Sequence, residues 1–191
     1  MGNQVRGYVL AQTLEFIRTR CAPRGGDELE AGLSPALQAA LSKLSPVDWA
    51  PREHLVELLT IVASSAHGEA ERYDVLASLG RYLSERTHNE FTSLLLGILT
   101  PELLAKKFPK LWQREHRGPA RLEFDPEGKR PGHARLRLVG VEGYDHVGAV
   151  WSGWLESLFR QVHPGRVDVE QSGWSAATPG PAAVQYELGW S

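Results

Sequence analysis

Seven histidines and a single cysteine are the side chains of this 191-residue sequence that most often bind metals. The histidines include no pair three or four residues apart, which is the spacing that puts two ligands on one face of a helix. Cys21 alone offers neither a thiolate cluster nor an intramolecular disulfide. We therefore expect no metal site, with the histidines at the surface or capping helices: His54, His67, His88, His116, His133, His146 and His163.

Two side chains are candidate nucleophiles, and neither has the surroundings that nucleophilic catalysis needs. Ser152, in VWSGW, falls within a helical repeat and not on a strand-to-helix elbow. Cys21 has Arg20 and Arg24 nearby to lower its pKa, but no histidine lies close in the sequence. The phosphate-binding spacing Gly-x-x-x-x-Gly-Lys-Ser/Thr is absent. The sequence predicts no catalytic residue and no enzymatic activity.

A basic cluster lies on a predicted helix over residues 101–117, largely opposite its apolar residues. One interpretation is a surface that binds an acidic protein partner. The other is ordinary solvation of a helix, with cations favoured toward its C-terminus. Both stay open for the residues concerned, which are Lys106, Lys107, Lys110 and Arg114, followed by Arg117.

Six tryptophans are a rich supply of large apolar rings for a chain of this length. Rings between a helix and a sheet either line a cavity for an apolar small molecule or pack without space. Gly148, within the apolar arc of its helix, hints at space or close approach. The candidate ligand pocket consists of Trp112, Gly148, Trp151, Trp154 and Phe159.

Composition excludes several classes of protein. A formal charge of −2 provides no overall field that would hold a nucleic acid, so none is expected as a partner. The longest apolar run, LLLGIL at 94–99, is too short to span a membrane. The N-terminal segment lacks the continuous apolar core of a secretory signal. We expect a cytoplasmic protein.

The first 117 residues have apolar residues at helical spacing. Ser34-Pro35 and Thr100-Pro101 each place a capping hydroxyl before a proline at the first helical position. The pattern predicts separate helices over 35–44, 51–66, 70–86, 88–98 and 101–116.

From residue 119 the apolar period changes to two, which indicates half-buried strands. The strands are RLEFD, HARLRLVGV, RVDVEQ and VQYELGW, and VGAVWSGWLESLFRQV between the second and third is an amphipathic helix. Clean alternation favours an antiparallel sheet. We predict an α+β fold in one domain (1–191): a helical layer over 1–117, then a four-stranded antiparallel sheet in β-β-α-β-β order over 119–191.

Several motifs resemble a myxobacteria-restricted paralogous family of uncharacterised proteins: PVDWAPREHLVELL, ASLGRYLSE, TPELLAKKFPKLW, VGAVWSGWLESLF and YELGW. That family is similar in architecture to the heme-NO-binding, 4-vinyl-reductase-type and transport-particle subunit domains. The resemblance covers nearly the whole chain and implies either a small-molecule sensor or a protein-assembly module.

The heme-NO-binding group marks its heme site with Tyr-x-Ser-x-Arg, and Tyr82-Leu83-Ser84-Glu85-Arg86 fits those letters. The match lies inside a predicted helix, before the sheet, where His67 or His54 would have to be the iron ligand. The main hypothesis is therefore a non-enzymatic sensory or adaptor domain, without a cofactor, that binds an apolar small molecule or a protein partner. The alternatives are a dimerising scaffold without ligand and a heme-based gas sensor.

Overall fold

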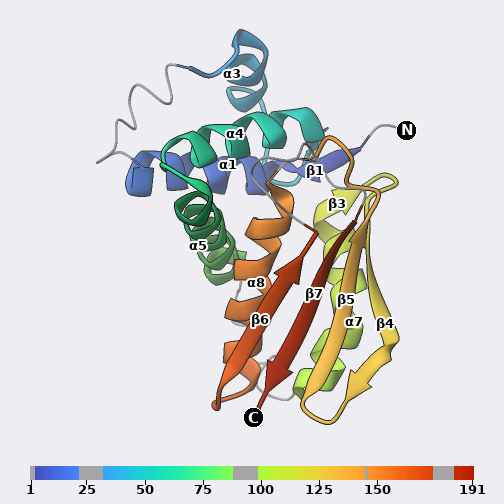
Figure 1. Ribbon diagram of the computed structural model, residues 1–191. Helices are drawn as coiled ribbons and strands as arrows, with labels where there is room; N and C mark the ends of the chain where they lie inside the picture. Colours follow the sequence, from blue (N-terminus) through green and yellow to red (C-terminus); the bar gives the residue numbers. More distant parts are fainter. Residues whose placement is uncertain (1–2, 22–31, 88–98, 145, 174–182) are drawn as a thin grey trace.

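The computed structural model of the chain describes residues 3–21, 32–87, 99–144, 146–173 and 183–191. Its helical part comprises α1 (Gly7–Phe16), which continues as the π-helical turn η1 (Ile17–Cys21), α3 (Pro35–Leu41), α4 (Arg52–Ser64) and α5 (Glu69–Thr87). Two further helices, α7 (Pro101–Glu115) and α8 (Val147–Val162), lie against a sheet (Figure 1). The predicted helix over 88–98 lies outside the described residues.

Two of the helix starts are fixed by the predicted caps. The Ser34 hydroxyl accepts a hydrogen bond from the backbone N–H of Leu37 at 3.2 Å, and the Thr100 hydroxyl accepts one from that of Leu103 at 3.3 Å. A proline follows each cap, where no backbone donor is needed. The predicted starts of α3 and α7 are confirmed, although α3 ends at Leu41 and not at residue 44.

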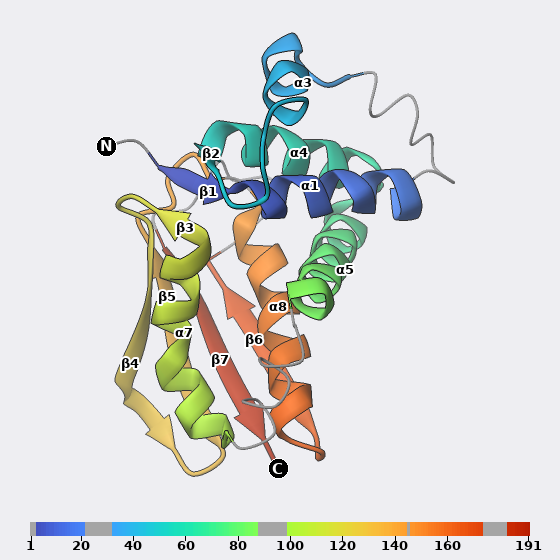
Figure 2. The same ribbon diagram turned by 180° about the vertical axis from the view of Figure 1, so that it is seen from behind.

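The larger sheet has four antiparallel strands: β4 (Arg121–Arg130), β5 (His133–Val139), β6 (Val167–Ser172) and β7 (Ala183–Trp190). Their order across the sheet is β4-β5-β7-β6, and α8 connects the two hairpin-like pairs. Both α7 and α8 lie on the same face of the sheet (Figure 2). The α+β class is confirmed, with alternate strand residues such as Ala134, Leu136 and Leu138 buried beneath the helices.

A second sheet was not predicted. Its three short strands, β1 (Gln4–Arg6), β2 (Trp49–Pro51) and β3 (His116–Arg117), pair antiparallel in the order β2-β1-β3. The prediction of a single sheet was therefore incomplete, because segments of two or three residues show no period. This small sheet ties the chain's first described residues to the end of α7, which positions the central site.

The contact between α5 and α8 is very close, and it depends on two glycines. A Cβ atom on Gly153 would lie 2.6 Å from the carbonyl carbon of Ala77, and one on Gly80 would lie 2.8 Å from the backbone nitrogen of Trp154. Real Cβ atoms do not come that close to backbone, so only glycine permits this approach.

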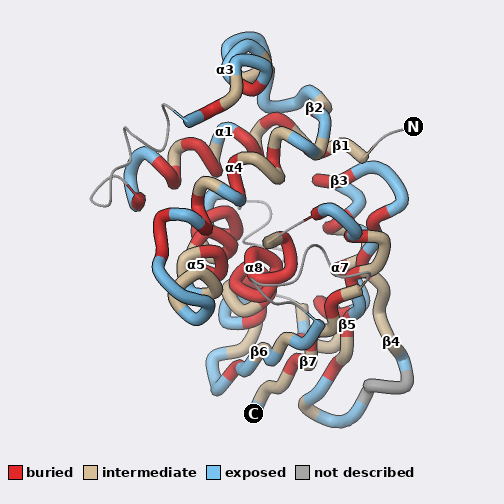
Figure 3. The backbone as a smooth tube through the Cα atoms, turned by 45° about the horizontal axis from the view of Figure 1, so that its top comes forward, coloured by how far each residue is buried: buried red, intermediate tan, exposed pale blue. Residues whose placement is uncertain are grey.

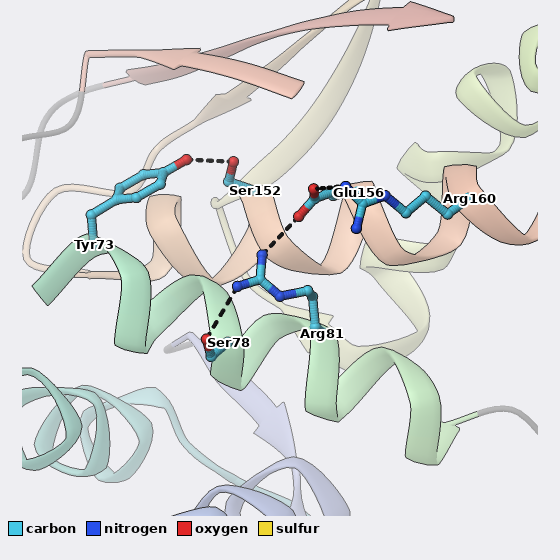
Figure 4. Close-up of polar contacts among 6 residues, drawn as sticks. All are labelled: Tyr73, Ser78, Arg81, Ser152, Glu156 and Arg160. Carbon is cyan, nitrogen blue, oxygen red and sulfur yellow. Dashed lines mark hydrogen bonds and ion pairs between the residues drawn. The ribbon is translucent and has the colours of Figure 1, made fainter. Parts of the chain in front are cut away.

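Polar contacts flank the glycines on the same two helices (Figure 4). The Tyr73 and Ser152 hydroxyls are 2.7 Å apart, and the Arg81 guanidinium donates to the Glu156 carboxylate at 2.7 Å. Ser152, the candidate nucleophile, is thus buried in a helix contact.

Helix α8 is the central element of the core (Figure 3). Its residues from Val147 to Leu155 are all buried, and the apolar side chains among them belong to one hydrophobic core that includes residues of both the helical part and the sheet. Among the described residues, no helix is long and apolar enough to cross a bilayer.

Candidate functional site

The predicted pocket residues Trp112, Trp151 and Trp154 come together where the helical part meets the sheet. With His116 and Tyr144 they form what we call the tryptophan cluster. The Trp112 and His116 rings stack with centroids 3.9 Å apart and planes within 10°. The Trp151 centroid lies 4.9 Å from that of Trp112 and 4.5 Å from that of Trp154. The five rings fill the centre of the molecule and are all buried.

Hydrogen bonds and the small sheet hold the cluster in place. His116 leaves α7 in an extended conformation because its backbone pairs with Val5 of β1. The Trp112 indole N–H donates to the Ala120 carbonyl at 2.9 Å. The Tyr144 hydroxyl lies 3.2 Å from His116 Nδ1, so the buried indole and the buried hydroxyl each have a partner.

The other two predicted pocket residues lie apart from the cluster. Gly148 is buried near the start of α8, and its carbonyl accepts a hydrogen bond from the Tyr186 hydroxyl at 3.0 Å. Phe159 packs between Phe108 and Trp190, with both centroid distances 5.5 Å. Gly148 therefore sits at a contact between helix and sheet.

Beside the cluster lies a cavity of about 20 Å³, lined by Tyr8, Gln12, Glu115, His116, Trp151 and Trp154 among others. We call it the junction cavity. Its volume is that of roughly one water molecule. The Tyr8 hydroxyl, Gln12 Oε1 and Glu115 Oε1 are buried and accept or donate no hydrogen bond within the described part of the chain, although Glu115 Oε1 lies 3.5 Å from an Arg114 nitrogen. These three atoms are the partners that a single bound water would need.

Burial shifts the pKa values of the ionisable groups around the junction cavity. It raises the pKa of Tyr8, an effect that the nearby Glu115 carboxylate increases, and it raises the pKa of Glu115 itself. The contact between these two side chains is electrostatic and lies outside good hydrogen-bond geometry. Burial also lowers the pKa of His116 to about 3. Each shift favours the uncharged form, as expected where water is excluded.

Acidification is expected to destabilise the protein through His116. Its pKa is about 3 in the folded state, against an ordinary value of 6.5, so the unfolded chain takes up a proton first as the pH falls. Between pH 7 and pH 5 this costs about 2 kcal/mol of unfolding free energy, at about 1.4 kcal/mol per pH unit below 6.5. Urea unfolding at the two pH values measures the loss.

Two variants separate this effect from that of Glu115. His116→Phe keeps a flat ring on Trp112 but cannot titrate, so its stability should not fall between pH 7 and pH 5. Glu115 has the opposite effect on the pH dependence of the unfolding free energy, because a raised carboxyl pKa makes the folded state gain stability as the pH falls. Glu115→Gln removes this effect. An equal acid loss in wild type and His116→Phe would show that His116 is not the group responsible.

An open groove of about 570 Å³ is lined mainly by residues of α5, together with Phe16 of α1 and Arg20 of η1. Among the residues that line it are Phe16, Arg20, Asp74, Arg81, Tyr82 and Glu85. Its charges are of both signs, and the described residues of the lining include no histidine. Cys21 is buried, and its sulfur accepts a hydrogen bond from the Ser65 hydroxyl at 3.7 Å.

The predicted partner-surface residues Lys106, Lys107, Lys110 and Arg114 are all exposed, and all lie on α7. The helix turns its apolar residues, including Phe108 and Trp112, into the core. Sequence reasoning thus separated the two faces of α7 correctly, but its function as an interface stays a prediction.

Solved structures of the same architecture are H-NOX proteins. The Fe(II) unliganded H-NOX protein from K. algicida superposes with a TM-score of 0.70 at 10% sequence identity, covering 97% of this chain and 96% of that one. A mutant of the T. tengcongensis H-NOX gives a TM-score of 0.58 at 11% identity, covering 97% of each chain. The chain has the H-NOX fold.

The similarity between this chain and the solved H-NOX structures is one of fold alone. No family model and no curated protein matches the sequence. Another solved structure with this fold, at a TM-score of 0.60 and 10% identity over 97% of this chain and 99% of that one, concerns heme redox potential and porphyrin distortion. Heme is thus a cofactor to consider for this H-NOX fold.

The junction cavity does not fit a heme. At about 20 Å³ it is far below the roughly 300–1,000 Å³ of pockets that enclose a ligand of that size. His116 is the histidine that lines it, but the His116 ring is stacked on Trp112 and its Nδ1 faces Tyr144. A porphyrin would have to displace the tryptophan cluster.

The Tyr-x-Ser-x-Arg letters of α5 do not form a heme site either. The Tyr82 ring packs edge-on against Phe16 at 5.4 Å. The Arg86 guanidinium lies 4.5 Å above the Tyr82 ring and pairs with Glu15 at 3.1 Å, so it already has an acidic partner. His67 is exposed and His54 is half-buried. Among the described residues, no group of three His, Cys, Asp or Glu side chains is arranged to hold a metal ion.

Sequence reasoning missed Tyr8, Gln12, Glu115, His116 and Tyr144 as residues of the central site. His116 was grouped with surface and capping histidines. No local pattern indicated this role, because His116 is already extended and pairs with Val5, a residue far away in the sequence.

Proposed function

We propose that this chain is a non-enzymatic sensory or adaptor domain of the H-NOX fold that works through a protein partner and without heme. The observation that carries the proposal is the packed tryptophan cluster, which leaves a cavity of about 20 Å³ where the helical part meets the sheet. Such a core supports a rigid scaffold better than a cofactor pocket.

The helix contacts support the same function. Glycines at the α5–α8 contact and ring stacking around Trp112 give an interior with little room for a ligand. An apolar small molecule in the junction cavity would require the rings to move. A protein partner needs only surface, and α7 offers an exposed basic face. The dimerising scaffold without a ligand remains the alternative to this proposal. We further propose that the protein is cytoplasmic and belongs to the myxobacterial family that its motifs resemble.

A heme-based gas sensor is the second candidate function. The shared fold favours it, since solved proteins at TM-scores of 0.60 to 0.70 include heme proteins. The side chains around the junction cavity argue against it.

Hemin titration followed by absorption spectroscopy decides between the two functions. We expect the purified protein to show no Soret band and no saturable shift when hemin is added, while the T. tengcongensis H-NOX protein, titrated in parallel, serves as the positive control. A stoichiometric Soret band that disappears in His116→Ala would overturn the heme-free function and establish the sensor.

A further inference from the structure

The exposed side of α7 carries a concentration of positive charge. We call Lys106, Lys107, Lys110, Arg114 and Arg117 the basic stripe. Lys106, Lys110 and Arg114 follow one another at four-residue steps, about 6 Å apart along the axis. Of the acidic residues on the same helix, Glu102 is half-buried at its start, and Glu115 is buried with one oxygen 3.5 Å from Arg114. The whole chain has a formal charge of −2, so the residues outside these five cations sum to −7.

Two arginines around Trp49 extend the stripe beyond the end of α7. The guanidinium carbons of Arg6 and Arg117 lie 4.1 Å and 3.9 Å from the centroid of the Trp49 ring. Arg6 also donates to the Arg114 carbonyl at 3.3 Å and to the Val47 carbonyl at 2.5 Å, which fixes its position. Arg117 is exposed, and no acceptor or carboxylate pairs with it among the described residues. A stacked, exposed guanidinium is a receptor for a carboxylate.

An exposed apolar side chain lies at each end of this surface. Leu103, at the start of α7, is 45% exposed, and Val47, whose carbonyl binds Arg6, is 71% exposed. They are the large hydrophobic side chains that the described part of the chain leaves exposed. Cations flanked by apolar anchors match a partner that has acidic and apolar residues on one face.

We propose that the basic stripe binds an acidic amphipathic helix of a protein partner. Carboxylates at four-residue steps on that helix would face Lys106, Lys110 and Arg114, and apolar residues at its ends would cover Leu103 and Val47. The inference rests on the proposed function and deepens it by naming the chemistry of the partner.

Other polyanions fit this surface less well. The guanidinium carbons of Arg6 and Arg117 lie within 4.1 Å of the Trp49 ring centroid, so this ring is already stacked and is a poor platform for a nucleic-acid base. The apolar face of α7 is buried in the core, so the helix cannot insert into a lipid surface. The two exposed apolar residues, Leu103 and Val47, are single aliphatic side chains at opposite ends of the surface, so they do not form a continuous face for a bilayer.

The test uses a fluorescein-labelled synthetic helical peptide with glutamate at every fourth position and leucine near both ends. Fluorescence anisotropy should show binding to the wild-type chain that weakens at least tenfold when salt is raised from low to physiological levels. The variant Lys106→Glu/Lys110→Glu/Arg114→Glu should bind at least tenfold more weakly still, and Arg117→Ala about threefold more weakly.

The matched control is Lys43→Glu/Arg130→Glu/Arg137→Glu, which changes the net charge equally at three exposed cations away from α7. The loss of three distant positive charges also weakens long-range attraction, and the salt series measures that part. After this correction, the control should bind the peptide within about twofold of the wild type. Equal weakening in both triple variants would overturn the proposal, and so would equal binding of a scrambled peptide of the same composition.

A duplex DNA oligomer and phosphatidylserine vesicles complete the experiment. Tighter binding of either one through the same residues would replace the helical partner with a nucleic acid or a membrane. Circular dichroism checks that each variant is folded. Because hemin binding is read separately by absorption, a protein that takes up heme and still binds the peptide would overturn only the heme-free function.

Discussion

Replacing Gly153 by alanine is expected to destabilise the protein by more than about 3 kcal/mol, or to prevent folding. The added Cβ would lie 2.6 Å from the carbonyl carbon of Ala77, and backbone cannot move aside as the end of a side chain can. Separating α5 from α8 to make room would lengthen the Tyr73–Ser152 and Arg81–Glu156 contacts (Figure 4). Urea unfolding followed by circular dichroism measures the loss.

A matched control for this substitution is Gly189→Ala on β7. A Cβ there would meet its nearest neighbour, His133 Cε1, at 3.5 Å, which is an ordinary contact. Its stability should stay within about 1 kcal/mol of the wild type. Gly80→Ala should destabilise the protein in the same way, because a Cβ on Gly80 of α5 would meet the backbone of Val150 and Trp154 of α8. A Gly153→Ala protein as stable as the wild type would show that the two helices are not this close.

Truncating Trp112 to alanine is expected to cost about 3–5 kcal/mol of unfolding free energy. The change removes a buried ring that contacts His116, Tyr144 and Trp151. It also leaves the Ala120 carbonyl without its indole donor. Trp112→Phe keeps most of the ring and should lose about 1–2 kcal/mol, chiefly from the missing hydrogen bond.

Trp49→Ala provides the comparison at the surface. That ring is half-buried and contacts two arginines, so its removal should cost less than about 2 kcal/mol. Equal losses for Trp49→Ala and Trp112→Ala would contradict the central position of the cluster.

The Trp112→Ala variant also tests whether the fold can hold an apolar ligand at the predicted pocket. The deletion should open a cavity the size of an indole beside Trp151 and Trp154. Millimolar indole is then expected to recover part of the lost stability in the variant and none in the wild type, because binding to the folded state alone stabilises it. If indole has no effect on the variant, the surrounding rings have closed over the space.

Local sequence patterns determined the elements that surround this site. The Ser-Pro pair at 34–35 and the Thr-Pro pair at 100–101 predicted two helix starts correctly. The capping hydroxyl and the proline, which has no backbone N–H, both act within the first turn of the helix. Alternation within HARLRLV predicted the inward face of β5, and the three-and-four spacing predicted that Trp151 and Trp154 would be buried. These predictions succeeded because each period is set by the geometry of a single element.

The same patterns did not predict the small sheet. Its strands pair residues 4–6 with 49–51 and 116–117, and segments that short carry no period of their own. Residues 4–6 therefore appeared to be helical, and His116 was grouped with surface histidines. Pairing with Val5 draws His116 out of α7 and onto the face of Trp112.

The sequence by itself determined an α+β chain with two-faced helices and half-buried strands, because side-chain periodicity reports which face of an element is buried. The tertiary structure alone decided how closely the central rings pack. That depends on distances between elements far apart in the sequence, such as the approach of α5 to α8 at Gly80 and Gly153. Close packing there and around Trp112 leaves a cavity of about 20 Å³, and the aromatic residues of the predicted pocket belong to the hydrophobic core, while ligand binding by them stays a prediction.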